Sequence, residues 1–411
     1  MRHTRVGWFG IGVGLVIISA LLLSIYWVIY QNFTTNSTDF VPRWEGTRAF
    51  FQEGISPYDP VVGERSQRVI YGRLAEPDED QVLFAYPFYT IFHVGLLAWL
   101  DYPVAAALYM ELLLLGVLGA MALVLHTIRW LPPPRVFGLY LLWTLISYFT
   151  VRGVLLAQPA LMVYLFHTLA IWAIFRERDT LAGVALGLAT LKPQTGFLLV
   201  PLLLIWAWRM GRWRIVLGFG GMFGTLMGLS FLLEPTWMSS WLTQVSDYRG
   251  YTETVPPMQR IADAIPLLPT TFTDAVYYGA SVILLGIVLA LWWRVLRQRQ
   301  NDELLWVIYF TMNITLLISP SVATTFYVEL FPVLYITGYL LVQQKQSALL
   351  FIVTPILLFG YWILHVVTLP PAGPAGAGLE APIVYIIFPL LTLGLLFGGR
   401  RAWPRVPQIS A

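Results

Sequence analysis

Long apolar runs separated by short polar segments follow one another along almost the whole chain. The first, from Gly7 to Tyr30, holds no Asp, Glu, Lys, Arg or His and exceeds the roughly 20 residues that a helix needs to cross a bilayer. The basic segment Met1–Arg5 precedes it, which predicts a cytoplasmic N-terminus. Because Tyr26–Tyr30 follows in place of a small-residue cleavage site, we favour an uncleaved first helix over a signal peptide.

Further apolar runs predict, with the first helix, an all-α polytopic membrane protein of about twelve transmembrane helices in one integral-membrane domain, 1–411. These runs cover 84–100, 103–128, 136–151, 157–175, 181–208, 215–233, 273–293, 304–318, 322–341, 347–369 and 382–398. The expected parts are a first helix (1–30), a first outer loop (31–83), core helices (84–233), a second outer loop (234–272) and C-terminal helices (273–411).

The positive charges set the expected orientation. Four basic clusters lie on the cytoplasmic side if 234–272, Ser319-Pro320 and 370–381 face outward, and both termini are then inside. The clusters are Arg209-Arg212-Arg214, Arg294-Arg297-Arg299, Lys345 and Arg400-Arg401-Arg405. Arg129 and Arg135 fall outside if every run between 84 and 208 spans once. If the run 181–208 is split at Lys192-Pro193 and another segment is re-entrant, the positive charges again lie on the cytoplasmic side. The sequence leaves that choice open.

The first outer loop is long and acidic, with nine of the chain's 22 acidic residues in 31–83. Residues 43–53 predict a short juxtamembrane amphipathic helix whose Trp44, Phe50 and Phe51 lie on the bilayer surface. Gly54-Ile-Ser-Pro-Tyr58 ends it, because Gly suits a helix C-cap and Pro cannot continue the hydrogen-bond ladder.

Composition excludes several classes of protein. With 58% hydrophobic and 11% charged residues, the chain is no ordinary soluble enzyme, and without Cys it has no thiol nucleophile or thiolate metal site. Its 25 basic and 22 acidic residues nearly cancel, so nucleic acid is not an expected partner. The histidines have no paired metal-ligand spacing, so we expect no metal. The acidic run 76–80 fits a solvated loop better than a divalent-cation site.

Asp39, nine residues beyond the first helix, is the first candidate for chemistry. A carboxylate at a membrane edge is partly desolvated, which raises its pKa toward the range of a general base, and the nearby Arg43 can hold an anion. The alternative is an N-cap of the helix that follows.

Lys192 is the second candidate and one of only two lysines. A buried ammonium in an apolar run normally faces a cavity, a carboxylate or an anionic ligand, and Pro193 breaks the helix where this charge lies. With the Gln194 amide it is suited to a lipid phosphate. The alternative is a lysine that extends to the membrane interface from a helix end.

Other polar residues are weaker candidates for a substrate cavity. Tyr86 begins the run after the acidic loop and also suits an aromatic belt, while Arg152 and Gln158 lie at a junction that also fits a simple loop. Glu111 and Glu329 lie in apolar runs, where a carboxylate normally faces the protein interior.

In order along the chain, these elements resemble glycosyltransferase family 87, a group of GT-C-type membrane enzymes that includes polyprenyl-phosphate-mannose-dependent mannosyltransferases. The resemblance runs from the first helix to about residue 332, and Lys192-Pro193-Gln194 is its most specific part. Its other parts are Asp39, Gly54–Tyr58, Phe84–Phe88, Gln158, the segment from Gly183 to Gln194, and Arg212-Trp213-Arg214. Two departures are Tyr86-Pro87-Phe88 in place of Tyr-Pro-Pro, and the segment 319–332, which lacks the family's histidine.

The resemblance implies a GT-C-like fold and an inverting transfer at the outer face of the plasma membrane. The sugar, mannose or another hexose, moves from a polyprenyl-phosphate donor to a lipid or glycan acceptor, without a further cofactor. Asp39 is then the general base, Lys192, Arg43 and Gln194 contact the donor phosphate, and Tyr58, Tyr86, Gln158, Arg152 and Tyr327 line the substrate cavity.

Two other functions fit the same features. A transporter or lipid-linked-sugar flippase also has many spans and a broken charged helix, although no paired halves are visible. A polysaccharide ligase or polymerase also acts on lipid-linked sugars, and the segment 234–272, with Trp237, Trp241, Asp247 and Arg260, keeps that hypothesis open. The sequence does not predict an oligomeric state.

Overall fold

The computed structural model describes residues 8–36, 38–77, 79–251, 256–263, 270–298, 302–368 and 382–404, and within them every regular element is a helix. Several sequence predictions lie outside these residues: the basic segment 1–5, Asp78, Arg299, Arg405 and the loop 370–381. The helices are α1 (Trp8–Asn32), α2 (Val41–Arg48), α3 (Pro60–Tyr71), α4 (Thr90–Val94), α5 (Tyr102–Thr127), α6 (Pro134–Ile146), α7 (Tyr148–Leu155), α8 (Ala160–Phe175), α9 (Asp179–Ala189), α10 (Pro193–Gly196), α11 (Leu199–Arg209), α12 (Trp213–Leu233), α13 (Trp237–Tyr251), α14 (Pro257–Asp263), α15 (Thr270–Gln298), α16 (Leu304–Ile318), α17 (Phe331–Gln343), α18 (Leu350–Thr368) and α19 (Pro382–Gly399).

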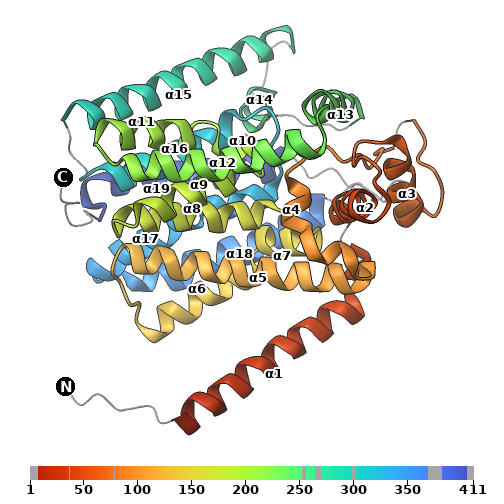
Figure 1. Ribbon diagram of the computed structural model, residues 1–411. Coiled ribbons are helices and arrows are strands. Elements are labelled where there is room, and N and C mark those ends of the chain that lie inside the picture. The colour runs from red at the N-terminus through yellow and green to blue at the C-terminus, as the bar shows by residue number, and fades with distance from the viewer. Residues whose placement is uncertain are drawn as a thin grey trace.

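The protein is an all-helical, membrane-embedded bundle. Six helices of the described chain are long and apolar enough to cross a membrane, and the bent pair α6–α7 makes a seventh if it counts as one span. In Figure 1 the long helices run roughly side by side, with α2 and α3 at one end of the bundle. Every residue of α16 is buried, which places this helix in the core. The expected count of about twelve spans stays a prediction.

The segment between residues 84 and 208 differs from a series of single spans. The run at 84–100 forms α4 and the short helix η4 (Gly95–Trp99), with Gly95 at a φ of 48° between them. The run at 181–208 is split at Lys192-Pro193 into α9, α10 and α11. In Figure 1 the connection between α5 and α6 lies at the same end of the bundle as the last turn of α15. Arg129 and Arg135 therefore flank a connection at the basic end of the bundle, as charge bias requires.

The segment after α1 folds back onto the helix bundle. Helix α2 is followed by a π-helical turn, η3 (Ala49–Glu53), and Gly54 ends it at a φ of 71°, as the sequence predicts. The prediction that Trp44 lies on the bilayer surface is wrong, because its ring packs edge-on against Tyr102 and its indole N–H donates to the Leu100 carbonyl. Phe50 packs against Phe88, and only Phe51 keeps substantial exposure.

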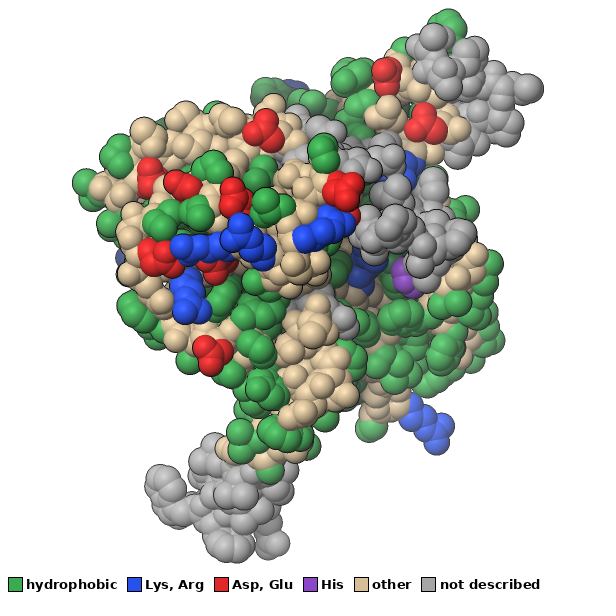
Figure 2. Space-filling view, turned by 90° about the vertical axis from the view of Figure 1, so that its right-hand side faces the viewer, with side chains coloured by type: hydrophobic (Ala, Val, Ile, Leu, Met, Phe, Trp, Pro, Cys, Tyr) green, Lys and Arg blue, Asp and Glu red, His purple; other side chains and the backbone are tan. Residues whose placement is uncertain are grey.

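Charged side chains gather at this end of the molecule, as Figure 2 shows. They include the ion pairs Arg65–Glu45, Arg65–Glu53, Arg68–Glu64 and Arg73–Glu79. In the acidic run, Glu79 accepts two hydrogen bonds from Arg73, at 2.7 and 2.8 Å, and the hydrogen bonds from Arg73 lower the pKa of this carboxyl to about 2. No group of three metal-ligating side chains occurs among the described residues, which do not include Asp78 of the acidic run.

Helices α9 and α12 pack closely because glycines lie where they cross. Gly183 and Gly187 are four residues apart on α9, and Gly218 on α12 faces Gly183. A Cβ at Gly183 overlaps with the Ile215 carbonyl oxygen, and a Cβ at Gly218 meets the Thr180 carbonyl oxygen at 2.5 Å. Small residues at this spacing allow backbones in a membrane to approach one another. This contact fixes α9, whose last turn leads into the Lys192 break.

We predict that Gly183→Ala destabilises the protein by about 1–3 kcal/mol, because the added methyl group forces the α9 and α12 backbones apart. Gly220→Ala on α12 is the matched control, since nothing lies within 4 Å of a Cβ there. Thermal unfolding of the detergent-solubilised proteins measures both effects. Equal unfolding temperatures for the two variants contradict the tight crossing.

Candidate active site

Asp39 lies in a short 3-10 helix, η2 (Thr38–Phe40), between α1 and α2. Its carboxylate does not cap α2, since the N-cap residue is Phe40 and no side chain bonds there. Instead, Asp39 Oδ2 accepts a hydrogen bond from the Gln158 side-chain amide, Nε2. The side chain is half-buried. Asp39 therefore faces the helix bundle and not its own helix terminus.

Gln158 joins the two principal candidates. Its Nε2 donates to Asp39, and its Oε1 accepts a hydrogen bond of 2.7 Å from Lys192 Nζ. The backbone turn after α7 presents this amide: Ala157 has a φ of 52°, and Gln158 N–H donates to the Gly153 carbonyl. One amide thus offers a donor to the carboxylate and an acceptor to the ammonium. Asp39, Gln158 and Lys192, called here the Asp39–Lys192 relay, form the centre of the site.

Lys192 lies in the break between α9 and α10, at the N-terminus of α10. It is only 7% exposed, and its ammonium lies 4.2 Å from the centre of the Phe326 ring, which comes from the 3-10 helix η5 (Thr324–Leu330). Pro193 begins α10 and the Thr195 hydroxyl donates to the Lys192 carbonyl, so the chain conformation at the break is fixed locally. The alternative of a lysine extending from a helix end to the interface does not fit this burial.

Arg43 is fully buried beneath the relay. Its Nε donates to the Asp39 carbonyl, Nη1 to the Tyr109 hydroxyl and Nη2 to the Ala157 carbonyl. Each guanidinium nitrogen therefore already has a protein acceptor. Arg43 ties the Asp39 backbone to the residue before Gln158, which favours a positioning role over the predicted phosphate contact.

Tyr86 and Tyr58 border the same region. The Arg43 guanidinium lies 5.3 Å from the centre of the Tyr86 ring, and the Tyr58 hydroxyl donates to the Tyr86 carbonyl at 2.8 Å. Burial raises the pKa of the Tyr86 hydroxyl to about 12, so this group stays protonated and able to donate. Gln244 on α13 donates to the Tyr58 carbonyl, which connects that helix to the site.

Two neighbouring groups were not predicted as part of the site. Asp80 is an exposed residue whose Oδ1 accepts a hydrogen bond of 2.8 Å from the Val82 N–H; partial desolvation of its carboxyl, and then repulsion from Asp39, raise the pKa of this group. His93 bonds to the Tyr109 hydroxyl at 3.0 Å, and burial, with the Arg43 charge, lowers the pKa of its imidazole to about 4. Nothing in their local sequence distinguishes them from loop and core residues.

The remaining predicted residues are held elsewhere. Gln194 is half-buried, and its carbonyl accepts a hydrogen bond of 3.4 Å from the Ser319 hydroxyl. Arg152 on α7 contacts the Tyr148 hydroxyl at 3.5 Å. Tyr327 is fully buried and donates to the Tyr385 carbonyl on α19, so its described contacts belong to helix packing and not to the relay.

The segment 319–332 contains no histidine, but the imidazole of His167 lies beside it. His167 Nδ1 on α8 is 2.8 Å from Glu329 Oε1 in η5, and both side chains are buried. His167 also lies against α10, because a Cβ at Gly196 meets its Nε2 at 2.9 Å. The pair therefore connects η5, which carries Phe326, with the element that follows Lys192. The prediction that Glu329 faces the interior is confirmed.

The fold and the relay together define a helical membrane protein. At the end of its helix bundle near α2, the Gln158 amide joins the Asp39 carboxylate to the Lys192 ammonium. The model of glycosyltransferase family 87 matches residues 84–320, more than half of the chain. The chain therefore belongs to glycosyltransferase family 87 and is a glycosyltransferase. No curated protein and no solved structure matches it.

The matched range divides the candidate residues. Tyr86, Arg152, Gln158, Lys192 and Gln194 fall within it. Asp39, Arg43 and Tyr58 precede it, and Tyr327 follows it. The assignment of Asp39 to the site therefore rests on its contacts with Gln158 and Arg43.

Proposed function

We propose that the protein transfers a hexose, with inversion, from a polyprenyl-phosphate donor to a hydroxyl of a lipid or glycan acceptor. The observation that carries this proposal is the relay: a half-buried carboxylate and a buried ammonium held one amide apart. A transfer of this kind needs a base for the acceptor and a cation for the departing phosphate, placed on opposite sides of one carbon atom.

Asp39 accepts the proton of the acceptor hydroxyl as its oxygen forms a bond to the anomeric carbon. The bond from that carbon to the phosphate oxygen breaks, and its electron pair leaves with the lipid phosphate. Among the described contacts, Lys192 Nζ donates one hydrogen bond, to Gln158. Because an ammonium carries three N–H groups, the others can donate to this phosphate. A positive charge in a site with little water stabilises the charge that develops on the leaving oxygen.

Gln158 and Arg43 act as positioning residues in this mechanism. The Gln158 amide keeps Asp39 and Lys192 from closing into a direct ion pair, which leaves each group able to act on substrate. Arg43 fixes the distance between the backbones that carry Asp39 and Gln158. Hydrogen bonds from positioning residues of this kind keep catalytic side chains close to the geometry that the reaction requires.

The aromatic residues beside the relay suit a sugar substrate. Tyr86 has a protonated hydroxyl and a ring next to Arg43. Aromatic faces with a polar edge accommodate the apolar and hydroxyl surfaces of a hexose. The proposal that the transferred hexose is mannose rests on the family resemblance alone.

We further propose that transfer occurs at the outer face of the plasma membrane, with both termini in the cytoplasm. The support is positional: the beginning of α1 and the end of α19 both lie on the side of Figure 1 opposite α2 and α3, although they are well apart from one another. The basic connections share the end where α19 stops, which is the end that charge bias assigns to the cytoplasm. A flippase with the same helices moves the lipid-linked sugar without breaking its bond to phosphate, so transfer assays separate the two functions.

We predict that Asp39→Asn lowers sugar transfer about 10²–10⁴-fold, because the amide keeps the shape of the side chain but cannot take a proton. Membranes containing the variant are assayed with labelled polyprenyl-phosphate hexose. Asp101→Asn is the matched control, since Asp101 is exposed and makes no side-chain cap bond at the start of α5. Undiminished transfer by Asp39→Asn removes Asp39 from the mechanism.

We also predict that Lys192→Met lowers transfer about 10²–10³-fold, because the charge that stabilises the leaving phosphate is lost while the apolar stem remains. Lys345→Met removes the chain's other lysine charge, which is exposed after α17, and is expected to leave transfer unchanged. The comparison is made at equal amounts of folded protein in membranes. Full transfer by Lys192→Met shows that another group neutralises the phosphate.

A further inference from the structure

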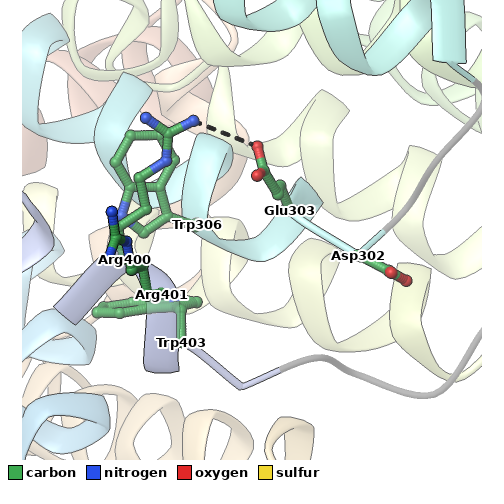
Figure 3. Close-up of a pocket in the computed structure, with 6 residues that line it drawn as sticks. All are labelled: Asp302, Glu303, Trp306, Arg400, Arg401 and Trp403. Carbon is green, nitrogen blue, oxygen red and sulfur yellow. Dashed lines mark hydrogen bonds and ion pairs between the residues drawn. The ribbon is translucent and has the colours of Figure 1, made fainter.

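A pocket of about 370 Å³ lies where α16 begins and α19 runs into the short helix η7 (Arg400–Ala402), as Figure 3 shows. None of the relay residues lines it. Helix α16 separates the two places, since Leu304 adjoins the pocket and Ser319, just past the other end, contacts Gln194. At 1.5 Å per residue, its 15 residues span about 22 Å. The residues that line the pocket are Asp302, Glu303, Trp306, Arg400, Arg401 and Trp403.

Two acidic and two basic side chains line the pocket, and one of the acids is already paired. Glu303 pairs with Arg294, and its Oε2 is also 3.5 Å from Arg400 Nη2, so one carboxylate serves two guanidinium groups. Arg400 is held in place over the Trp306 ring, 4.5 Å from its centre. Arg401 has no ion pair or hydrogen bond in the described part of the chain, and in Figure 3 Asp302 points away from both arginines. Arg401 is therefore an exposed cation at the pocket without a partner among the described residues.

Trp403 supplies a buried hydrogen-bond donor at the pocket. Its side chain is 6% exposed, yet its indole N–H has no acceptor among the described residues. Trp306, in the same pocket, differs because its indole N–H donates to the Leu396 carbonyl at 2.8 Å. A buried donor without an acceptor is unfavourable unless a ligand supplies one. Arg401 and Trp403 together favour a ligand that is negative in charge and carries acceptor oxygens.

The surroundings of the pocket suit a lipid. It lies at the ends of α15 and α19, which both qualify as membrane spans. Phe397 on α19 is 55% exposed and Trp293 on α15 is 66% exposed, so apolar surface leads away from the pocket along both helices. A headgroup phosphate in the pocket thus allows acyl chains to lie on these helices. Basic pockets of this kind between membrane helices bind anionic lipid headgroups.

We propose that this pocket binds the phosphate of an anionic phospholipid, held by Arg401, Arg400 and the Trp403 indole N–H. The lipid comes from the leaflet at the end of the bundle where α19 stops. This site is independent of the proposed glycosyl transfer and lies at the opposite end of α16 from Lys192.

The test uses the full-length protein in detergent, with phosphatidylglycerol, phosphatidylcholine or inorganic phosphate added separately. We expect phosphatidylglycerol to raise the unfolding temperature and to be retained in native mass spectra. Arg401→Gln is expected to weaken this binding roughly tenfold, because a charge-assisted contact is lost. Arg297→Gln, an exposed arginine of α15 outside the pocket, is the matched control and keeps wild-type binding.

Trp403→Phe supplies a second variant, because it keeps an aromatic ring and removes only the N–H donor. It is expected to weaken phosphatidylglycerol binding while unfolding as cooperatively as wild type in the absence of lipid. Equal losses in Arg401→Gln and Arg297→Gln indicate a general charge effect and overturn the proposal. So does stabilisation by phosphatidylcholine, or by inorganic phosphate, that matches phosphatidylglycerol.

Discussion

The side-chain amide of Gln158 is the contact on which the catalytic arrangement depends. It donates to the half-buried Asp39 carboxylate and accepts from the buried Lys192 ammonium, so one side chain is hydrogen-bonded to both charges. Without it, the buried ammonium and the half-buried carboxylate each lose a hydrogen-bond partner, which is most costly for the buried group. With it, the carboxylate and the ammonium stay separate, and a glycosyltransferase gains a base and a phosphate-binding cation within one cluster.

Several contacts hold the three residues of the relay in place. The close crossing of α9 and α12 at Gly183 fixes the helix that leads to Lys192, and Pro193 prevents that helix from continuing. Arg43 bonds to the carbonyls of Asp39 and Ala157, so it sets the spacing between the loop after α1 and the turn after α7. The buried pair of His167 and Glu329 connects α8 to η5, whose Phe326 ring covers the ammonium. Stability and chemistry are therefore coupled here, since the same contacts serve both.

Sequence patterns predicted the helical membrane class, the break at Lys192-Pro193 and the individual candidates Asp39, Gln158 and Lys192. They did not predict that Gln158 joins the other two, because its partners lie 119 and 34 residues away along the chain. Arg43 was expected at a phosphate because its charge is visible in sequence, whereas its burial among Tyr109 and the Ala157 carbonyl depends on tertiary packing. Trp44 was misplaced for the same reason: its apolar ring suits a bilayer surface or a protein interior equally well, and α5 supplies the interior.

The central claim is that the sugar's anomeric carbon lies between Asp39 and Lys192 when the donor is bound. The most direct test is an electron cryomicroscopy structure with a polyprenyl-phosphonate hexose, in which a carbon atom replaces the oxygen that bridges sugar and phosphorus. The account predicts phosphonate oxygens within hydrogen-bond distance of Lys192 Nζ, about 2.7–3.2 Å, and an anomeric carbon whose open face points toward Asp39. A phosphonate bound away from Lys192, or an anomeric carbon turned from Asp39, contradicts it.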